Sequence, residues 1–164
     1  MILELLDVNI GQLIRSLSLA IGDGQQLSIM GPTGSGKTTL LRAILGFIPI
    51  DSGFISIDGE LLTPLSAPYF RKQMAYVPQR LSLPKGYRGM GLERWGDLSD
   101  DERYLLLLGN AVKTDKPMLI VDEPLHPLSE KNRERADSLL QEAAGQGKTI
   151  LAVGAAILRN QLQL

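Results

Sequence analysis

A glycine-rich segment constrains this chain more than any other feature. Residues 31–38 read Gly-Pro-Thr-Gly-Ser-Gly-Lys-Thr. In such a segment successive backbone N–H groups converge on phosphate oxygens, and the following helix presents its positive end to them. The required context is present, because residues 26–30 are expected to form a strand and residues 37–45 a helix that ends at Gly46. The segment therefore predicts a phosphate-binding loop between a strand and a helix.

The residue types of the loop assign it a ligand. Glycine is needed at positions 31 and 36 because a side chain would block the approach of the phosphates. We expect Lys37 to neutralise the β and γ phosphates and the hydroxyl of Thr38 to ligate Mg²⁺. The prediction is an ATP site with Mg²⁺, and its nucleotide-binding residues are Gly31, Pro32, Thr33, Gly34, Ser35, Gly36, Lys37, Thr38 and Thr39.

A second motif supplies carboxylates. Residues 118–121, Met-Leu-Ile-Val, read as a buried strand, and Asp122 and Glu123 follow directly. Two adjacent acids also occur as an ordinary polar strand end. Together with the phosphate loop they favour a catalytic reading, in which Asp122 holds Mg²⁺ through water and Glu123 orients or deprotonates the attacking water.

Hydrophobic periodicity divides the chain into two kinds of structure. Residues 2–8 and 13–21 alternate with period two, and residues 54–57 followed by Asp58-Gly59 read as a hairpin. These segments predict an N-terminal antiparallel β layer. The second half alternates short strands with helices, which predicts a mostly parallel sheet flanked by helices. Its expected elements are strands at 74–77, 118–121 and 149–153 and helices at 99–112 and from Ser129 to a closing Gly145.

Composition limits the function classes. The chain has 164 residues with 44% apolar side chains, so we expect one α/β domain spanning residues 1–164. A formal net charge of −1 provides no long-range attraction for nucleic acid. The chain has no cysteine, which excludes disulfides and thiolate metal sites. No apolar run approaches the roughly 20 residues needed to cross a bilayer.

In the order of its motifs, the chain resembles the ATP-binding subunits of ABC transporters. Residues 31–40 match the phosphate loop of that family, residues 76–79, Tyr-Val-Pro-Gln, match its Q-loop, and residues 119–124 match its Walker B segment. The resemblance implies that Gln79 contacts the metal and the attacking water, as a catalytic residue and a metal ligand. Without the resemblance, Gln79 would read as a polar loop residue.

The resemblance also implies partners and a location. Subunits of this family pair with a membrane-spanning transporter subunit and with a second ATP-binding subunit, here an identical chain or, by preference, a different one. The chain would be cytoplasmic and peripheral to the inner face of the membrane through that partner. No nucleic acid partner is implied.

The family signature is altered here. The family has Leu-Ser-Gly-Gly-Gln, and residues 98–102 read Leu-Ser-Asp-Asp-Glu. In the family this helix start faces the γ phosphate bound by the other subunit. Each unit of like charge at about 4 Å costs about 1 kcal/mol in water and about 4 kcal/mol at an effective dielectric constant of about 20. We therefore expect poor clamping of ATP. A plainer reading is that Ser99 and Glu102 form a capping box for a helix.

Three further family features are absent or changed. Gly154-Ala155-Ala156 stands where the switch histidine is expected, and the only histidine, His126, reads as a turn residue or as a relocated switch. No aromatic residue lies near Asn9-Ile10-Gly11, where many members stack one on adenine. The helical subdomain is reduced to residues 80–98, which we expect to form a loop with at most one helical turn.

Three functions follow from these observations. The first is Mg-ATP binding with slow hydrolysis as a cytoplasmic ABC transporter subunit, an ATPase of weak or partner-dependent activity. The second is a non-hydrolysing, ATP-responsive regulatory or vestigial subunit, favoured by the acidic signature and the missing histidine. The third is a small P-loop kinase, which would need an arginine-bearing lid; Arg80, Arg88 and Arg94 keep it open.

Overall fold

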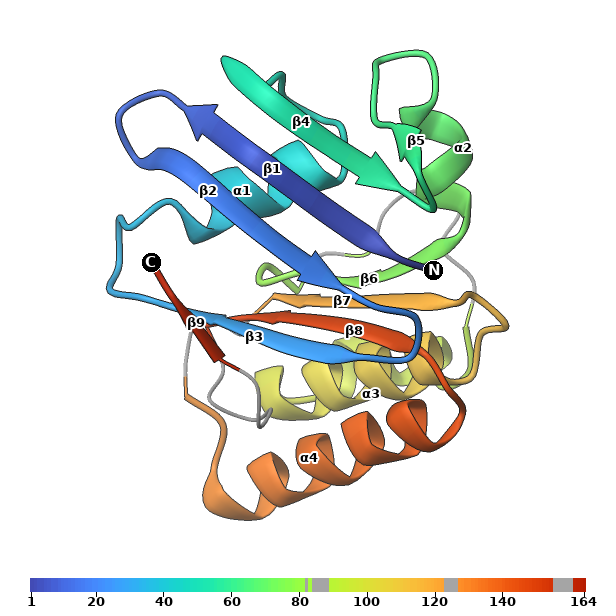
Figure 1. Ribbon diagram of the computed structural model, residues 1–164. Helices are drawn as coiled ribbons and strands as arrows, with labels where there is room; N and C mark the ends of the chain where they lie inside the picture. Colours follow the sequence, from blue (N-terminus) through green and yellow to red (C-terminus); the bar gives the residue numbers. More distant parts are fainter. Residues whose placement is uncertain (82, 84–88, 123–126, 155–160) are drawn as a thin grey trace.

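The computed structural model describes residues 1–81, 83, 89–122, 127–154 and 161–164. In this part of the chain helix α1 (Lys37–Ile44) lies between two β-sheets, and helices α3 (Asp100–Val112) and α4 (Glu130–Gly145) cover the outer face of the lower sheet (Figure 1). One sheet is antiparallel, with the order β2-β1-β4-β5. Its strands are β1 (Leu3–Ile10), β2 (Ile14–Ile21), β4 (Ser52–Ile57) and β5 (Glu60–Leu61).

The second sheet is parallel, with the order β6-β7-β8-β3-β9 among the described residues. Its strands are β3 (Gln26–Met30), β6 (Met74–Val77), β7 (Met118–Asp122), β8 (Thr149–Val153) and β9 (Gln161–Gln163). A parallel sheet needs cover on both faces, and here α1 and the antiparallel sheet cover one face while α3 and α4 cover the other (Figure 1). This arrangement confirms the expected α/β fold with an antiparallel β layer.

Alternation along the parallel strands distributes their side chains between two cores. In β7, Met118 and Ile120 join the buried cluster around α1, whereas Leu119 and Val121 join the cluster around α3 and α4. Because successive side chains point to opposite faces, Asp122 belongs to the α1 face. The strand register thus directs this carboxylate toward the helix that follows the phosphate loop.

Several expected elements are confirmed by the structure. The strands at 26–30, 74–77 and 149–153 have the predicted bounds, and α1 follows the glycine-rich loop. At the start of α3, Ser99 N–H donates to Oε2 of Glu102 at 2.8 Å, and Glu102 N–H donates to Oγ of Ser99 at 3.3 Å. The capping-box reading of these two residues was therefore right.

Other expectations need correction. Helix α2 (Ala67–Lys72) and strand β9 were not predicted, and the expected single helical turn before α3 is a six-residue 3₁₀ helix, η1 (Leu92–Asp97). Ser129 stands at the N-cap of α4, but its side chain makes no capping hydrogen bond. Helix α4 includes Gly145, and the glycine with left-handed backbone after it is Gly147, with φ 76°.

The described part of the shortened segment is fastened to α3. The side-chain amide of Asn110 accepts a hydrogen bond from the Met90 N–H and donates one to the Met90 carbonyl, both at 3.1 Å. Nε of Arg103 donates to the Trp95 carbonyl at 3.0 Å, and its guanidinium lies 5.5 Å from the Trp95 ring centroid. Residues 89–98 therefore follow α3 closely.

No helix among the described residues is long and apolar enough to cross a membrane.

Candidate nucleotide site

Two glycines of the phosphate loop lie where a side chain has no room. A Cβ on Gly31 would lie 2.6 Å from Oγ of Ser35, and a Cβ on Gly36 would lie 2.9 Å from Cδ1 of Ile14. Both glycines also have positive φ, 156° and 96°. The backbone of this loop therefore requires glycine at positions 31 and 36, for both space and conformation.

Lys37 spans the loop from the first residue of α1. Its ammonium group donates to the carbonyl oxygens of Gly31 at 2.7 Å and Pro32 at 2.9 Å. The first turn of α1 carries no acidic side chain, so the positive end of the helix is not neutralised there. A positive charge and a positive helix end therefore meet at this loop, as an anion site requires.

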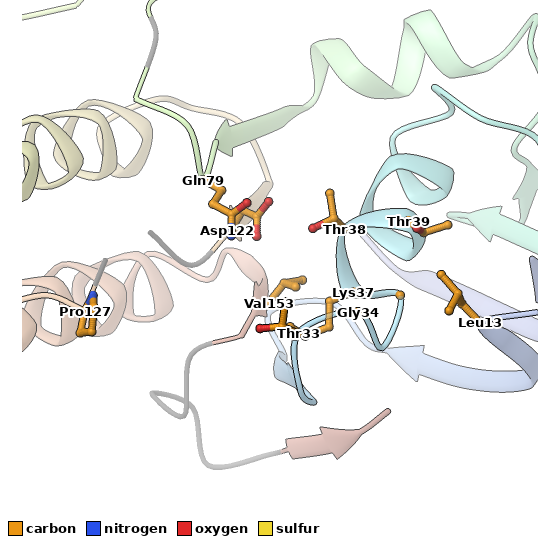
Figure 2. A pocket seen from close by; sticks show the side chains of 11 residues that line it. Leu13, Thr33, Gly34, Lys37, Thr38, Thr39, Gln79, Asp122, Pro127 and Val153 are labelled. Atoms are coloured by element: carbon orange, nitrogen blue, oxygen red, sulfur yellow. The ribbon is translucent and has the colours of Figure 1, made fainter. Parts of the chain in front are cut away.

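A cavity of about 490 Å³ brings the predicted site together from three elements. Thr38 reaches it from α1, Asp122 from the end of β7, and Gln79 from the segment after β6 (Figure 2). Its remaining described lining residues are Leu13, Thr33, Gly34, Gly36, Lys37, Thr39, Pro127 and Val153. In the view of Figure 2, Gln79 and Asp122 are drawn on one side of Thr38, and Leu13 is drawn on the other.

Not every predicted residue lines the cavity. Gly31, Pro32 and Ser35 belong to the loop but are not among its described lining residues. Glu123 lies outside the described residues, as do His126 and Ala155. Leu13, Pro127 and Val153 line the cavity without having been predicted. Leu13 is exposed and lies against Gly36 of the phosphate loop. Nothing in the sequence marks an exposed leucine beside a strand as a site residue.

Asp122 is buried, with 3% of its surface exposed, and two tyrosines hold it. The side chain of Tyr76 interacts electrostatically with its carboxylate, and the phenol of Tyr104 donates to its backbone carbonyl at 3.3 Å. Burial, followed by the negative charge of Asp122, raises the pKa of Tyr76 to about 12, although nearby Arg42 opposes the shift. The Tyr76 phenol therefore stays protonated at neutral pH and remains a donor.

The residues present fit a magnesium nucleotide. The Ser35 hydroxyl oxygen is buried and, within the described part of the chain, has no hydrogen-bond partner, so it is available to a phosphate oxygen. The loop offers the positive charge of Lys37 and close backbone approach at Gly36. Thr38 and Asp122 face the same cavity with oxygen atoms, which Mg²⁺ prefers, and Mg²⁺ commonly takes its other ligands from phosphates and water.

The acids at the start of α3 are engaged within the chain. Oδ2 of Asp101 accepts from the Asn132 side chain at 2.8 Å and from the Ser129 N–H at 3.1 Å. These bonds, that of Asn132 first, hold the pKa of Asp101 below its ordinary value. Asp100 pairs with Arg103 at 3.4 Å, and the hydrogen bonds with Ser99 lower the pKa of Glu102. The start of α3 is thereby tied to the start of α4.

Comparison with known proteins points to one family. The sequence profile of the ABC transporter family matches residues 14–92. The manganese transport system ATP-binding protein of Listeria innocua is 26% identical, over 85% of this chain and 72% of its own length. The thiamine import ATP-binding protein of Vibrio parahaemolyticus is 30% identical, over 82% of this chain and 71% of its own length. The chain belongs to the ABC transporter ATP-binding family.

Solved structures agree on the fold of this ABC cassette. A putative ABC transporter ATP-binding protein from Pyrococcus furiosus superposes with a TM-score of 0.79 at 15% identity, covering 100% of this chain and 98% of that one. The dimeric structure of a bacterial ABC transporter cassette gives a TM-score of 0.78 at 23% identity, covering 99% and 94%. ABC ATPases as a family use ATP and Mg²⁺.

Some relatives are much longer. A probable ABC transporter ATP-binding/permease protein of Haemophilus influenzae is 29% identical to this cassette. The matched region covers 74% of this cassette but only 29% of the length of that protein.

Proposed function

We propose that residues 1–164 form one ATP-binding domain that binds Mg-ATP and hydrolyses it slowly as the nucleotide-binding subunit of an ABC transporter. The supporting observation is the convergence of Lys37, Thr38, Gln79 and Asp122 on one cavity. The cassette would be cytoplasmic and would reach the inner face of the membrane through a membrane-spanning subunit. Both the location and the partner follow from family membership and remain part of the proposal.

The proposed roles follow from the atoms that each residue presents. The backbone N–H groups of residues 33–38, the ammonium of Lys37 and the hydroxyl of Ser35 would bind the phosphates. Thr38 and Asp122 would hold Mg²⁺, which when bound neutralises phosphate charge. Gln79 would orient the attacking water beside the metal, and Glu123 would accept its proton.

Slow turnover is proposed from two departures. Alanine at position 155 offers no side-chain donor to the γ phosphate, and losing one such donor costs about 100- to 1,000-fold in turnover. The acids at 100–102 would also repel the phosphates of a nucleotide held by an opposing cassette. A partner with an intact signature would complete the site on this chain's phosphate loop. We therefore favour a heterodimer of two different cassettes over a homodimer.

A non-hydrolysing, ATP-responsive subunit is the second candidate. The observation that favours it is the pair of hydrogen bonds that Asp101 accepts from Ser129 and Asn132, because they commit part of the signature to holding α3 and α4 together. In this case nucleotide would still bind at Lys37. Turnover would be absent in every preparation, with or without a partner cassette.

Steady-state Mg-ATP hydrolysis by the purified cassette, with ATP affinity measured in the same samples, tests the proposal. Glu123→Gln should abolish turnover and retain ATP binding. Lys37→Ala should weaken binding about 10- to 100-fold, the worth of a charge-assisted bond of about 1.5–3 kcal/mol. Lys131→Ala, an exposed lysine of α4, is the matched control and should change neither quantity.

Two results would contradict the proposal. ATP affinity that is the same in the original chain and in Lys37→Ala would show that the cavity is not the nucleotide site. Binding without turnover in the original chain, with or without an intact cassette added, would favour the regulatory subunit.

A further inference from the structure

We propose that Tyr76 is a positioning residue for magnesium: its phenol fixes the orientation of the Asp122 carboxylate that faces Thr38. This inference rests on the proposed function, because it assumes that Asp122 serves a metal bound with nucleotide. It adds a residue that neither the phosphate loop nor the Walker B segment contains.

Strand register puts the two side chains on one face. In the parallel pair of β6 and β7, Tyr76 lies opposite Ile120, and Asp122 is two residues further along β7. Side chains two residues apart on a strand share a face, so Tyr76 and Asp122 both lie on the α1 side of the sheet. Asp122 of β7 and Arg42 of α1 both act on the Tyr76 phenol electrostatically.

The register brings the Tyr76 phenol beside Asp122, and the two side chains interact electrostatically. A carboxylate only accepts, so in the arrangement we propose the Tyr76 phenol is the donor and Asp122 the acceptor. Asp122 is 3% exposed and therefore meets little bulk water, which makes each donor from the protein matter more to its charged form. The donor also restricts the carboxylate to fewer rotamers. An oxygen held in this way meets a metal without further ordering.

The peptide of Asp122 is held from the opposite side of the sheet. Tyr104 of α3 is 2% exposed, and its phenol donates to the Asp122 carbonyl at 3.3 Å. One tyrosine therefore fixes the backbone at the end of β7 and the other fixes the side chain. Both arrangements are of the kind that holds metal ligands in place, where losing an outer partner typically costs about 10- to 100-fold in metal affinity or activity.

The test is Tyr76→Phe, which removes one oxygen from a side chain that is 39% exposed and should therefore leave the fold intact. Mn²⁺ is used as the probe, titrated into the cassette with saturating ATP and followed by the loss of its free EPR signal. We expect Mn²⁺ affinity to fall by about 10-fold or more. ATP affinity in EDTA should stay the same, because no metal takes part. Tyr69→Phe, 62% exposed on α2, is the matched control and should keep the original Mn²⁺ affinity.

A double-mutant cycle then asks whether Tyr76 acts through Asp122. In an Asp122→Asn background, Tyr76→Phe should change Mn²⁺ affinity by less than about two-fold, because the oriented carboxylate is already gone. An equal loss in both backgrounds would overturn the positioning role, and so would an unchanged affinity in Tyr76→Phe alone. Failure of the original chain to bind ATP even with Mn²⁺ would instead refute the proposed function, so the two failures are distinguishable.

Discussion

Two buried hydroxyl groups on neighbouring strands differ in whether they are hydrogen-bonded. Thr149 on β8 has no exposed surface; its Oγ1 donates to the Met1 carbonyl at 2.7 Å and accepts from the Gly24 N–H at 3.1 Å. Ser28 on β3 is equally buried, yet its hydroxyl has no hydrogen-bond partner within the described part of the chain. An unpaired buried hydroxyl costs about 1–3 kcal/mol, whereas a paired one contributes to stability.

Removing these two hydroxyls should change the free energy of unfolding in opposite directions. Ser28→Ala should raise the free energy of unfolding by about 1 kcal/mol, because it removes an unsatisfied polar atom with little change of volume. Thr149→Val should lower it by about 1–3 kcal/mol, because the Gly24 N–H loses its partner. Urea unfolding followed by circular dichroism measures both. A Ser28→Ala cassette less stable than the original would show that the hydroxyl has a partner after all.

At single positions, sequence reasoning found the residues whose chemistry depends on local spacing. The loop from Gly31 to Thr38 is contiguous, so the spacing of its residues in the sequence was enough to predict it. Tyr76 and Leu13 were not found as site residues because they meet the site only through the sheet register and the packing against Gly36. The predicted roles of Gln79 and Glu123 remain predictions, and Glu123 lies outside the described residues.

Among the elements, those with a strong period were predictable and those made by tertiary contact were not. Strands β3, β6 and β8 each combine apolar residues with clear flanking turns. Helix α2 has only six residues and buries only Ala67 and Phe70, which is too little for a helical period to show. Strand β9 has three residues and forms by pairing with β3. Three residues are too few to show a strand pattern in the sequence, so β9 was not predicted.

The junction of α3 and α4 gives a prediction for whole elements. Asp101 accepts from the N–H of Ser129, the N-cap residue of α4, and from the Asn132 side chain, so Asp101→Ala should lower the free energy of unfolding by about 1 kcal/mol. Asp100→Ala is the matched control: it also removes an acid from the first turn of α3, but its carboxylate is 64% exposed and contacts Arg103 at 3.4 Å. The difference between the variants measures the contact with α4.

The same contact has a defined dependence on pH. The pKa of Asp101 is lower in the folded state than its ordinary value of 3.8, so its contribution is complete above that value and is lost as pH falls through the folded pKa. The stability difference between the original chain and Asp101→Ala should therefore be constant near pH 7 and shrink below about pH 4. Urea unfolding at a series of pH values measures it. A difference that grows on acidification would contradict the assignment.

For the whole molecule, the position of Asp122 links three layers. Its carboxylate lies on the α1 side with Tyr76, its carbonyl is held by Tyr104 of α3, and α3 is tied to α4 through Asp101. In this way the end of strand β7 is contacted from both faces of the sheet. The start of α3 is thus connected to the carboxylate of the nucleotide cavity through α3 itself and the buried Tyr104.

A dimerisation experiment tests what the acids at the start of α3 do. We expect Glu123→Gln with saturating Mg-ATP to remain monomeric at micromolar concentration in sedimentation velocity. Asp100 and Glu102 are exposed on α3, and their negative charges would repel a phosphate brought close to them by an opposing cassette. Removing them should therefore permit an ATP-dependent dimer.

The matched variant adds Asp100→Gly and Glu102→Gln to Glu123→Gln and keeps Asp101, so the contact with Ser129 and Asn132 stays in place. Glutamine at position 102 also preserves the capping box with Ser99. ATP should then increase the sedimentation coefficient of this variant, and the increase should disappear when Lys37→Ala is added. If Glu123→Gln alone dimerises with ATP, the acids do not repel nucleotide, and the preference for a different partner cassette loses its physical basis.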